Sequence, residues 1–404
     1  QDVGTDRYIS TLSTSVDSWI IDGKKVQSTQ KPTIVSSTLT WEKVTTLDLG
    51  LDARFFNDAL GVTFDWYNRT TSDILTTANL PATLGADAPY ENMGTIQTKG
   101  WELAIDYRHT FKNGLHFGVT ASVADDKTEV TKWTYNTKIP SYGATGWWDK
   151  SAYKEGMVLG DIWGLQFDRF LTEDDFNADG SLKAGLPDQT KVFPAGYQFA
   201  PGDVLYKDLD NNGEIVKQTN TNDKGDLSVI GNALPRLQFG LNLDAAWKGF
   251  DISMFFQGVA KRKLWAAGNQ VLPGFTTGEP FYKGAEDYWT PENTDAFYPR
   301  PMDYKQSASG NYSVNDRYLL NMAYLRLKTF TVGYSLPKVW LSKFKVQGLR
   351  VYFTGENLFT IDGVKPAIDP EIGIRTASGK SDQRNFGRSY PYQKTVSFGI
   401  QLSL

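Results

Sequence analysis

The alternation of apolar and polar residues between positions 235 and 258, PRLQFGLNLDAAWKGFDISMFFQG, constrains this chain more than any other feature. Apolar side chains occupy every second position from 237 to 247 and again from 250 to 256, on either side of a Lys248-Gly249 turn. A period of two residues is typical of a β-strand, so the stretch predicts a hairpin with one apolar and one polar face. In water such a sheet hides its apolar face, whereas a barrel in lipid turns that face outward.

The same alternation recurs along the chain. It appears in hairpins at 47–67 and 101–123, in a less regular pair at about 318–336 and 346–358, and in the final strand at 395–404. In the less regular pair, Leu325 and Leu327 fall out of phase with Phe330, which predicts a β-bulge. The pattern therefore predicts nine strands joined as antiparallel neighbours.

The lengths of the connections favour a membrane barrel. Links within pairs are short, near 57, 112, 248 and 337–345, whereas links between pairs are long, at about 70–94, 132–234, 259–317 and 359–389. Outer-membrane barrels have short periplasmic turns and long external loops. Charged residues such as Asp65, Glu102 and Asp244 recur on the polar face, where a wet lumen tolerates them. We therefore predict an all-β, transmembrane antiparallel β-barrel whose apolar face meets lipid.

Composition excludes several other classes of protein. The chain has no cysteine, which rules out disulfides and thiolate metal sites, and its net charge of -4 argues against nucleic acid as a partner. No apolar run reaches the roughly 18 residues of a membrane helix, but barrel strands of about 9 to 11 residues escape that criterion. No phosphate, dinucleotide, serine-esterase or zinc-protease motif is present, so we expect no enzyme.

The odd number of predicted strands indicates an incomplete barrel. Unpaired strand edges facing hydrocarbon cost several kcal/mol per polar group, so further strands are expected in another segment or chain. On this interpretation residues 1–40 belong to an external loop and residues 41–404 supply barrel strands and loops, as the C-terminal portion of a larger protein.

Several segments resemble SusC/RagA-like TonB-dependent outer-membrane transporters. They include LTWEKVTTLDLGLD at 39–52, NMGTIQTKGWELAIDY at 92–107, PGDVLYKDLDNNGEI at 201–215, DYWTPENTDAFYPRP at 287–301 and VYFTGENLFT at 351–360, all in the family's order. The resemblance covers most of the chain. It implies a 22-stranded barrel in the outer membrane of a Gram-negative bacterium, with a plug domain that is not in this chain.

The resemblance also implies a function and partners. Members import oligosaccharides or, in some cases, peptides, driven by TonB and assisted by a SusD-like surface lipoprotein that acts as a lid. We therefore expect TonB-dependent import of bulky nutrients, with oligosaccharides favoured over peptides. A passive porin and a soluble carbohydrate-binding β-protein are the alternatives. The collinear family segments argue against the porin, and partitioning distinguishes the soluble protein, which stays in the aqueous fraction, from the importer, which needs detergent.

One external segment resembles the start of a calcium loop. Asp208, Asp210, Asn212 and Glu214 place oxygen ligands at alternate positions around Gly213, as in an EF-hand. The twelfth position, which should hold a bidentate acid, is Thr219; Asp223 or Asp226 can substitute only if the intervening residues loop out. The other interpretation is a turn rich in Asp and Asn. Ca²⁺ is the one cofactor that the sequence suggests.

Aromatic residues in the long loops are candidate substrate contacts, because flat rings stack on sugar faces or hold peptides. Large loops also need small cores, which is the alternative role for the same residues. Trp289, inside a family-like segment, is expected to be structural. The candidates are Trp147, Trp148, Trp163, Trp265 and Tyr282.

Overall fold

The structure is a computed structural model. It describes residues 9–10, 12, 14–29, 34–77, 88–134, 153–217, 223–266, 268–275, 281–302, 310–341, 346–365, 368–371, 390 and 392–403.

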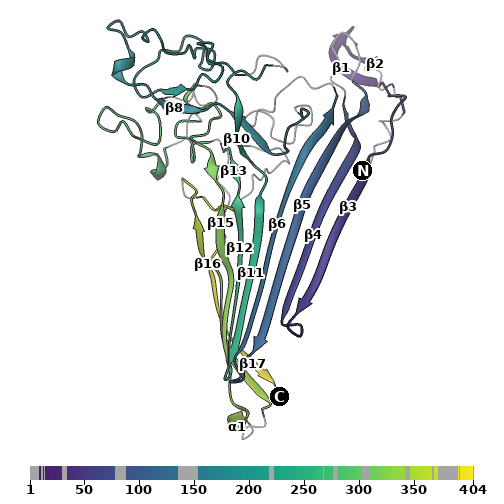
Figure 1. Ribbon diagram of the computed structural model, residues 1–404. Helices are drawn as coiled ribbons and strands as arrows, with labels where there is room; N and C mark the ends of the chain where they lie inside the picture. The colour runs from purple at the N-terminus through teal and green to yellow at the C-terminus, as the bar shows by residue number, and fades with distance from the viewer. Residues whose placement is uncertain are drawn as a thin grey trace.

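One curved antiparallel sheet of nine strands forms the body of the molecule (Figure 1). Its order is β17-β16-β15-β12-β11-β6-β5-β4-β3. Each of these nine strands is therefore hydrogen-bonded to the strand of the sheet that precedes or follows it in the sequence. The strands are β3 (Lys43–Phe55), β4 (Leu60–Thr77), β5 (Tyr90–Thr110), β6 (His116–Trp133), β11 (Arg236–Trp247), β12 (Phe250–Lys261), β15 (Tyr324–Ser335), β16 (Gly348–Asp362) and β17 (Thr395–Ser403). The nine strands expected from the sequence are confirmed.

Strand registers also agree with the alternation. The expected bulge is present, because the pairing of β15 with both of its neighbours shifts around Leu327 and Thr329. Strands β4 and β5 extend further than expected, so the connection between them covers 78–89 rather than 70–94. Short turns lie at the lower end of the wall in Figure 1, where α1 (Lys338–Leu341) joins β15 to β16, and the long connections lie at the upper end.

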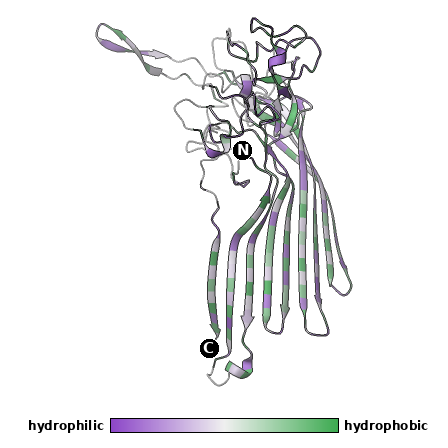
Figure 2. Cartoon of the chain, turned by 90° about the vertical axis from the view of Figure 1, so that its left-hand side faces the viewer, coloured by the Kyte–Doolittle hydropathy of each residue, from purple (hydrophilic) through white to green (hydrophobic). Residues whose placement is uncertain are grey.

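Among the residues that the structure describes, none forms a second layer against the apolar face of the sheet. On β17, Val396, Phe398 and Ile400 are exposed by 54%, 81% and 74%, and Figure 2 shows apolar residues alternating with polar ones along the strands. Rings also remain exposed at the lower turns, including Phe56, Phe111 and Trp247. A soluble sandwich would cover such residues, so the arrangement fits a face that meets lipid.

The polar face is the concave side of the sheet, because a pocket spans its residues from β4 to β12, among them Asp65, Glu102 and Gln238. On this face, glycines lie beneath large side chains of neighbouring strands. A Cβ on Gly399 would lie 2.2 Å from the Tyr352 ring, and one on Gly100 would lie 2.4 Å from the Tyr67 ring. Each tyrosine thus lies flat across a glycine of the neighbouring strand, which fills the gap left by the missing side chain.

The long connections fold into an external domain with cores of its own. One core contains Trp265, Tyr318 and Met322, and a second contains Tyr206, Phe193 and Trp289. Small strand pairs support them: β7 (Asp161–Gly164) with β10 (Ser228–Asn232), β8 (Phe167–Phe170) with β9 (Val204–Tyr206), and β13 (Lys263–Leu264) with β14 (Leu320–Asn321). The 3-10 helices are η4 (Glu173–Asp175), η5 (Lys283–Ala285) and η7 (Gly310–Tyr312).

Residues before the wall form a separate hairpin of β1 (Thr14–Ile21) and β2 (Lys24–Thr29) at the upper end (Figure 1). Within the described ranges, no helix is both long enough and apolar enough to cross a membrane.

Candidate functional site

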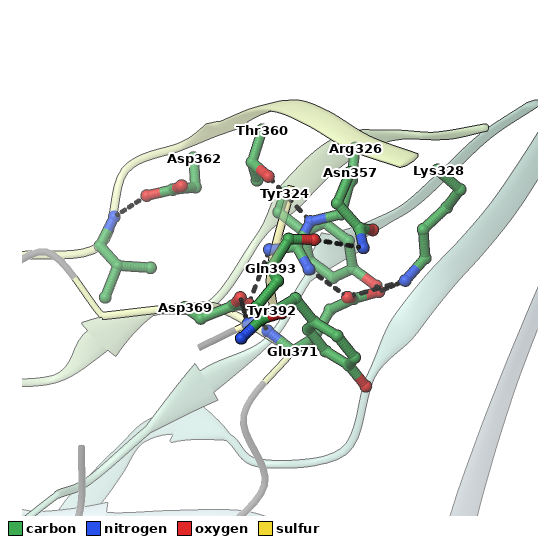
Figure 3. A network of polar contacts seen from close by, with 11 residues as sticks. Tyr324, Arg326, Lys328, Asn357, Thr360, Asp362, Asp369, Glu371, Tyr392 and Gln393 are labelled. Carbon is green, nitrogen blue, oxygen red and sulfur yellow. Dashed lines mark hydrogen bonds and ion pairs between the residues drawn. The ribbon is translucent and has the colours of Figure 1, made fainter. Parts of the chain in front are cut away.

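A buried ionic network holds the connection between β16 and β17 against the upper end of β15 (Figure 3). Arg326, only 3% exposed, donates through Nη2 to Asp369 at 2.7 Å and through Nη1 to Glu371. Lys328 Nζ reaches Glu371 at 2.8 Å, and the hydroxyl of Tyr324 donates to the same carboxylate at 2.8 Å. Two cations and two carboxylates therefore balance one another away from water.

The strand register places this network on the concave side. Arg326 pairs across the sheet with Gln257, a residue of the polar face. The Tyr392 ring covers the network, with Arg326 at 5.3 Å and Lys328 at 4.9 Å from its centroid. The described residues Asp369, Glu371 and Tyr392 of this connection thus lie against the polar side of β15 at its upper end.

Further charged pairs line the concave face below the mouth. Arg54 binds Asp106 at 2.7 Å, and Arg350 binds Asp251 through two contacts at 2.5 and 3.0 Å. These pairs satisfy charged side chains near the short-turn end of the wall. A solute that meets this end of the concave face would meet charged groups.

The predicted calcium loop folds as an acidic turn. The Asp208 carboxylate accepts from the N–H groups of Asn212 and Gly213, at 3.3 and 2.8 Å. Asp226, which is fully buried, joins Asp208 and Asp210, and one oxygen from each lies within 4.8 Å of the others. Of the two acids considered from the sequence, Asp223 and Asp226, it is Asp226 that lies in the cluster with Asp208 and Asp210.

Two of the predicted calcium ligands have other partners. Asn212 Oδ1 accepts the Glu214 N–H at 2.7 Å, and the Glu214 carboxylate pairs with Lys191. Desolvation, together with the negative charges of Asp226 and Asp208, raises the pKa of Asp210. A cation would relieve this repulsion, but three clustered carboxylates are also common without one, so calcium binding stays a prediction.

The predicted aromatic contacts are dispersed. Trp147 and Trp148 lie outside the described residues. Trp265 is 2% exposed inside a core, so its ring is enclosed, whereas Trp163 is partly buried where it packs against the other core. Trp289 is 7% exposed in the second core, which confirms its expected structural role.

Tyr282 borders a cavity in the external domain. This cavity has a volume of about 430 Å³, and exposed rings of Phe281, Tyr282 and Tyr288 lie at its edge. Tyr298 forms part of its wall, and its hydroxyl donates to the Val271 carbonyl at 3.0 Å. Burial is the main cause that raises the Tyr298 pKa to about 12, and the negative charge of Asp287 adds to it. The cavity is mainly aromatic and can accept a flat or ring-shaped group.

Comparisons with known proteins agree on the family. Residues 6–358 match the family described as TonB dependent receptor-like, beta-barrel. The chain is 27% identical over 395 residues to TonB-dependent receptor P3 of Formosa agariphila, covering 95% of this chain and 36% of that protein. It is 24% identical over 391 residues to TonB-dependent receptor SusC of Bacteroides thetaiotaomicron, covering 95% and 34%.

Among solved structures, the fold resembles the RagAB peptide importer in its open-open state. The TM-score is 0.67 at 20% identity, covering all of this chain and 38% of that one. The chain belongs to the TonB-dependent receptor β-barrel family, as its sequence indicated. Its sheet is therefore part of an outer-membrane barrel of a Gram-negative bacterium, and the chain spans about a third of the curated relatives that it matches.

Proposed function

We propose that this chain supplies the lipid-facing wall and external mouth of a TonB-dependent importer of bulky nutrients. Its similarity to SusC along 95% of the chain carries the proposal. The charged pairs on the concave face and the ionic network around Arg326 support it, because a solute path needs a polar lining. A passive porin is the alternative, and it would not require energy.

Oligosaccharides are the substrates that we favour. The cavity beside Tyr282 supports this choice, since exposed aromatic rings stack on the apolar faces of sugars. Peptides are the second candidate, because the same rings can hold an aromatic or proline side chain.

We further propose two protein partners. A SusD-like lipoprotein would close over the external mouth, and TonB would act through a part of the protein that this chain does not contain. Neither requires chemistry on the substrate, so the protein acts as a carrier rather than an enzyme.

Uptake measurements test this function. Cells that carry or lack the protein are given labelled oligosaccharides and labelled peptides, with and without a protonophore. We expect energy-dependent uptake of oligosaccharides; energy-independent uptake would favour the porin, and uptake of peptides alone would identify the second substrate class.

Tyr282→Ala tests the cavity separately. Losing one stacked ring should weaken substrate binding by roughly three- to tenfold. Trp340→Ala is the matched control, because that ring is also exposed but lies at the opposite end of the wall. Equal affinity in both variants would remove the cavity from the transport path.

A further inference from the structure

A second cavity is hollowed into the concave face of the wall, away from the external domain and the Tyr282 cavity. It has a volume of about 510 Å³, and residues of five adjacent strands, from β4 to β12, border it. Neighbouring strands lie about 4.8 Å apart, so the cavity extends about 19 Å across the sheet. We call this elongated cavity the lumen trough.

Small residues form the floor of the lumen trough. Ala104, Ser122 and Gly240 are register partners in a row across β5, β6 and β11. Thr63 and Gln257 continue this row on the two outer strands. A Cβ on Gly240 would lie 3.2 Å from the Ser122 hydroxyl oxygen. Larger side chains in the middle of the row would fill the space, so the sequence itself hollows the wall at this level.

Two carboxylates border one end of the lumen trough. Asp65 of β4 and Glu102 of β5 are register partners, so their side chains are neighbours on the same face of the sheet. Like charges directly opposite each other across a sheet are destabilising. Among the described residues, neither carboxylate forms a salt bridge. A cationic group that enters this end would relieve their repulsion.

The opposite end of the lumen trough is aromatic. Phe255 is the register partner of Asn242, which places its ring on the polar face, and the residue is 39% exposed there. A Cβ on Gly240 would lie 3.6 Å from this ring, so the ring leans over the floor. Gln238 and Gln257 lie beside it and supply amide donors and acceptors. An open aromatic face in an aqueous lumen can cover a sugar ring or attract a cation.

We propose that the lumen trough binds an elongated solute that carries ammonium groups, such as an oligomer of amino sugars or a lysine-containing peptide. An ammonium group would lie between Asp65 and Glu102, and the remainder of the solute would extend across the small-residue floor to Phe255. A single inorganic cation would fill only a small part of this volume. The inference rests on the proposed import function and narrows its substrate class to cationic solutes.

The test measures binding by calorimetry to the complete protein, purified in detergent from its native outer membrane. The probes are a glucosamine tetramer with protonated amines, the N-acetylglucosamine tetramer of equal length without charge, and tetralysine. The test variant is Asp65→Asn/Glu102→Gln. The control, Asp48→Asn/Glu356→Gln, removes two exposed carboxylates of the polar face that do not border the lumen trough. Heat-dependent electrophoretic migration confirms that each variant is folded.

We expect the native protein to bind the cationic tetramers more tightly than the acetylated one. The test variant should lose about five- to tenfold in affinity for the glucosamine tetramer, with no change toward its acetylated counterpart, and the control should lose less than about twofold. A loss confined to tetralysine would support the same site with a peptide as its ligand.

Three results would overturn the proposal. They are equal affinity of the native protein for charged and acetylated tetramers, equal losses in the test and control variants, and no binding by the native protein. The last result would mean that another part of the protein fills the lumen trough. Because binding needs no energy source, binding without energy-dependent uptake would reject the proposed function alone, and energy-dependent uptake without charge-dependent binding would reject the lumen trough alone.

Discussion

The wall and the external domain place the same residue types in opposite surroundings. Trp247 at a turn of the wall is 44% exposed, whereas Trp265 in the external domain is 2% exposed. The wall is one layer whose apolar side chains point away from the protein, and the external domain encloses its apolar side chains in separate cores. Burial thus follows the surrounding solvent: lipid around the wall, and water around the external domain.

Replacing the two tryptophans tests this contrast most strongly. Trp265→Ala removes a large ring from a closed core and should destabilise the external domain by about 3–5 kcal/mol. Trp247→Ala should have a smaller effect, because 44% of that residue is already exposed and its removal leaves no closed cavity. Thermal unfolding followed by tryptophan fluorescence measures both, and similar losses would contradict the contrast.

Adjacent residues of β12 test the two faces of the wall. Met254 lies on the apolar face and Ser253 on the polar face. Met254→Arg should cost about 2–4 kcal/mol if it lies at the bilayer midplane, whereas Ser253→Arg places its charge in the lumen. Urea unfolding in lipid vesicles should rank Met254→Arg as the less stable variant; the reverse ranking would mean that the faces are misassigned.

Acid stability probes the external domain alone. Hydrogen bonding to Arg169 is the main cause that lowers the pKa of Asp175 to about 2 from 3.8. A lowered carboxyl pKa stabilises the folded state above the unfolded value, here by about 2 kcal/mol, and this contribution is lost as pH falls from about 4 to 2. Asp175→Asn should remove that loss along with the stabilisation.

Unfolding of the external domain at neutral and acid pH measures this effect. Asp174→Asn is the control, since the Asp174 side chain is exposed and Arg169 pairs with Asp175 instead. If both variants show the native pH dependence, the Arg169–Asp175 pair does not contribute to acid stability.

Calcium should have the smallest effect. If the cluster of Asp208, Asp210 and Asp226 binds calcium, a concentration about tenfold above Kd should stabilise the external domain by about 1.4 kcal/mol. Asp226→Asn should abolish that gain, and Asp179→Asn, in another acidic turn, should retain it. Calorimetry that detects no calcium uptake by the native protein would reject the site.

Much of the wall was predictable, because a strand with one lipid face and one polar face repeats its pattern every two residues. The pattern weakens where both faces of a strand meet protein or water. The sequence therefore predicted β4 and β5 to be shorter at their external ends than they are. The bulge near Leu327 was visible because it reverses the phase of the alternation.

The sites were less predictable, because they join residues that are distant in the sequence. Asp369 and Glu371 lie 43 and 45 positions from Arg326, and no local motif connects them. Trp265 lies in an irregular segment without a periodic pattern, so the sequence does not indicate whether its ring is buried in a core or exposed to a substrate.

The tyrosines that lie over glycines have a consequence for assembly. A slip of one residue between β16 and β17 would place the Tyr352 ring against Phe398 or Ile400 instead of Gly399, and would also reverse the faces of the strand. Only one alignment of β16 and β17 places the Tyr352 ring over Gly399, so this contact can select the correct strand register while the barrel is being inserted.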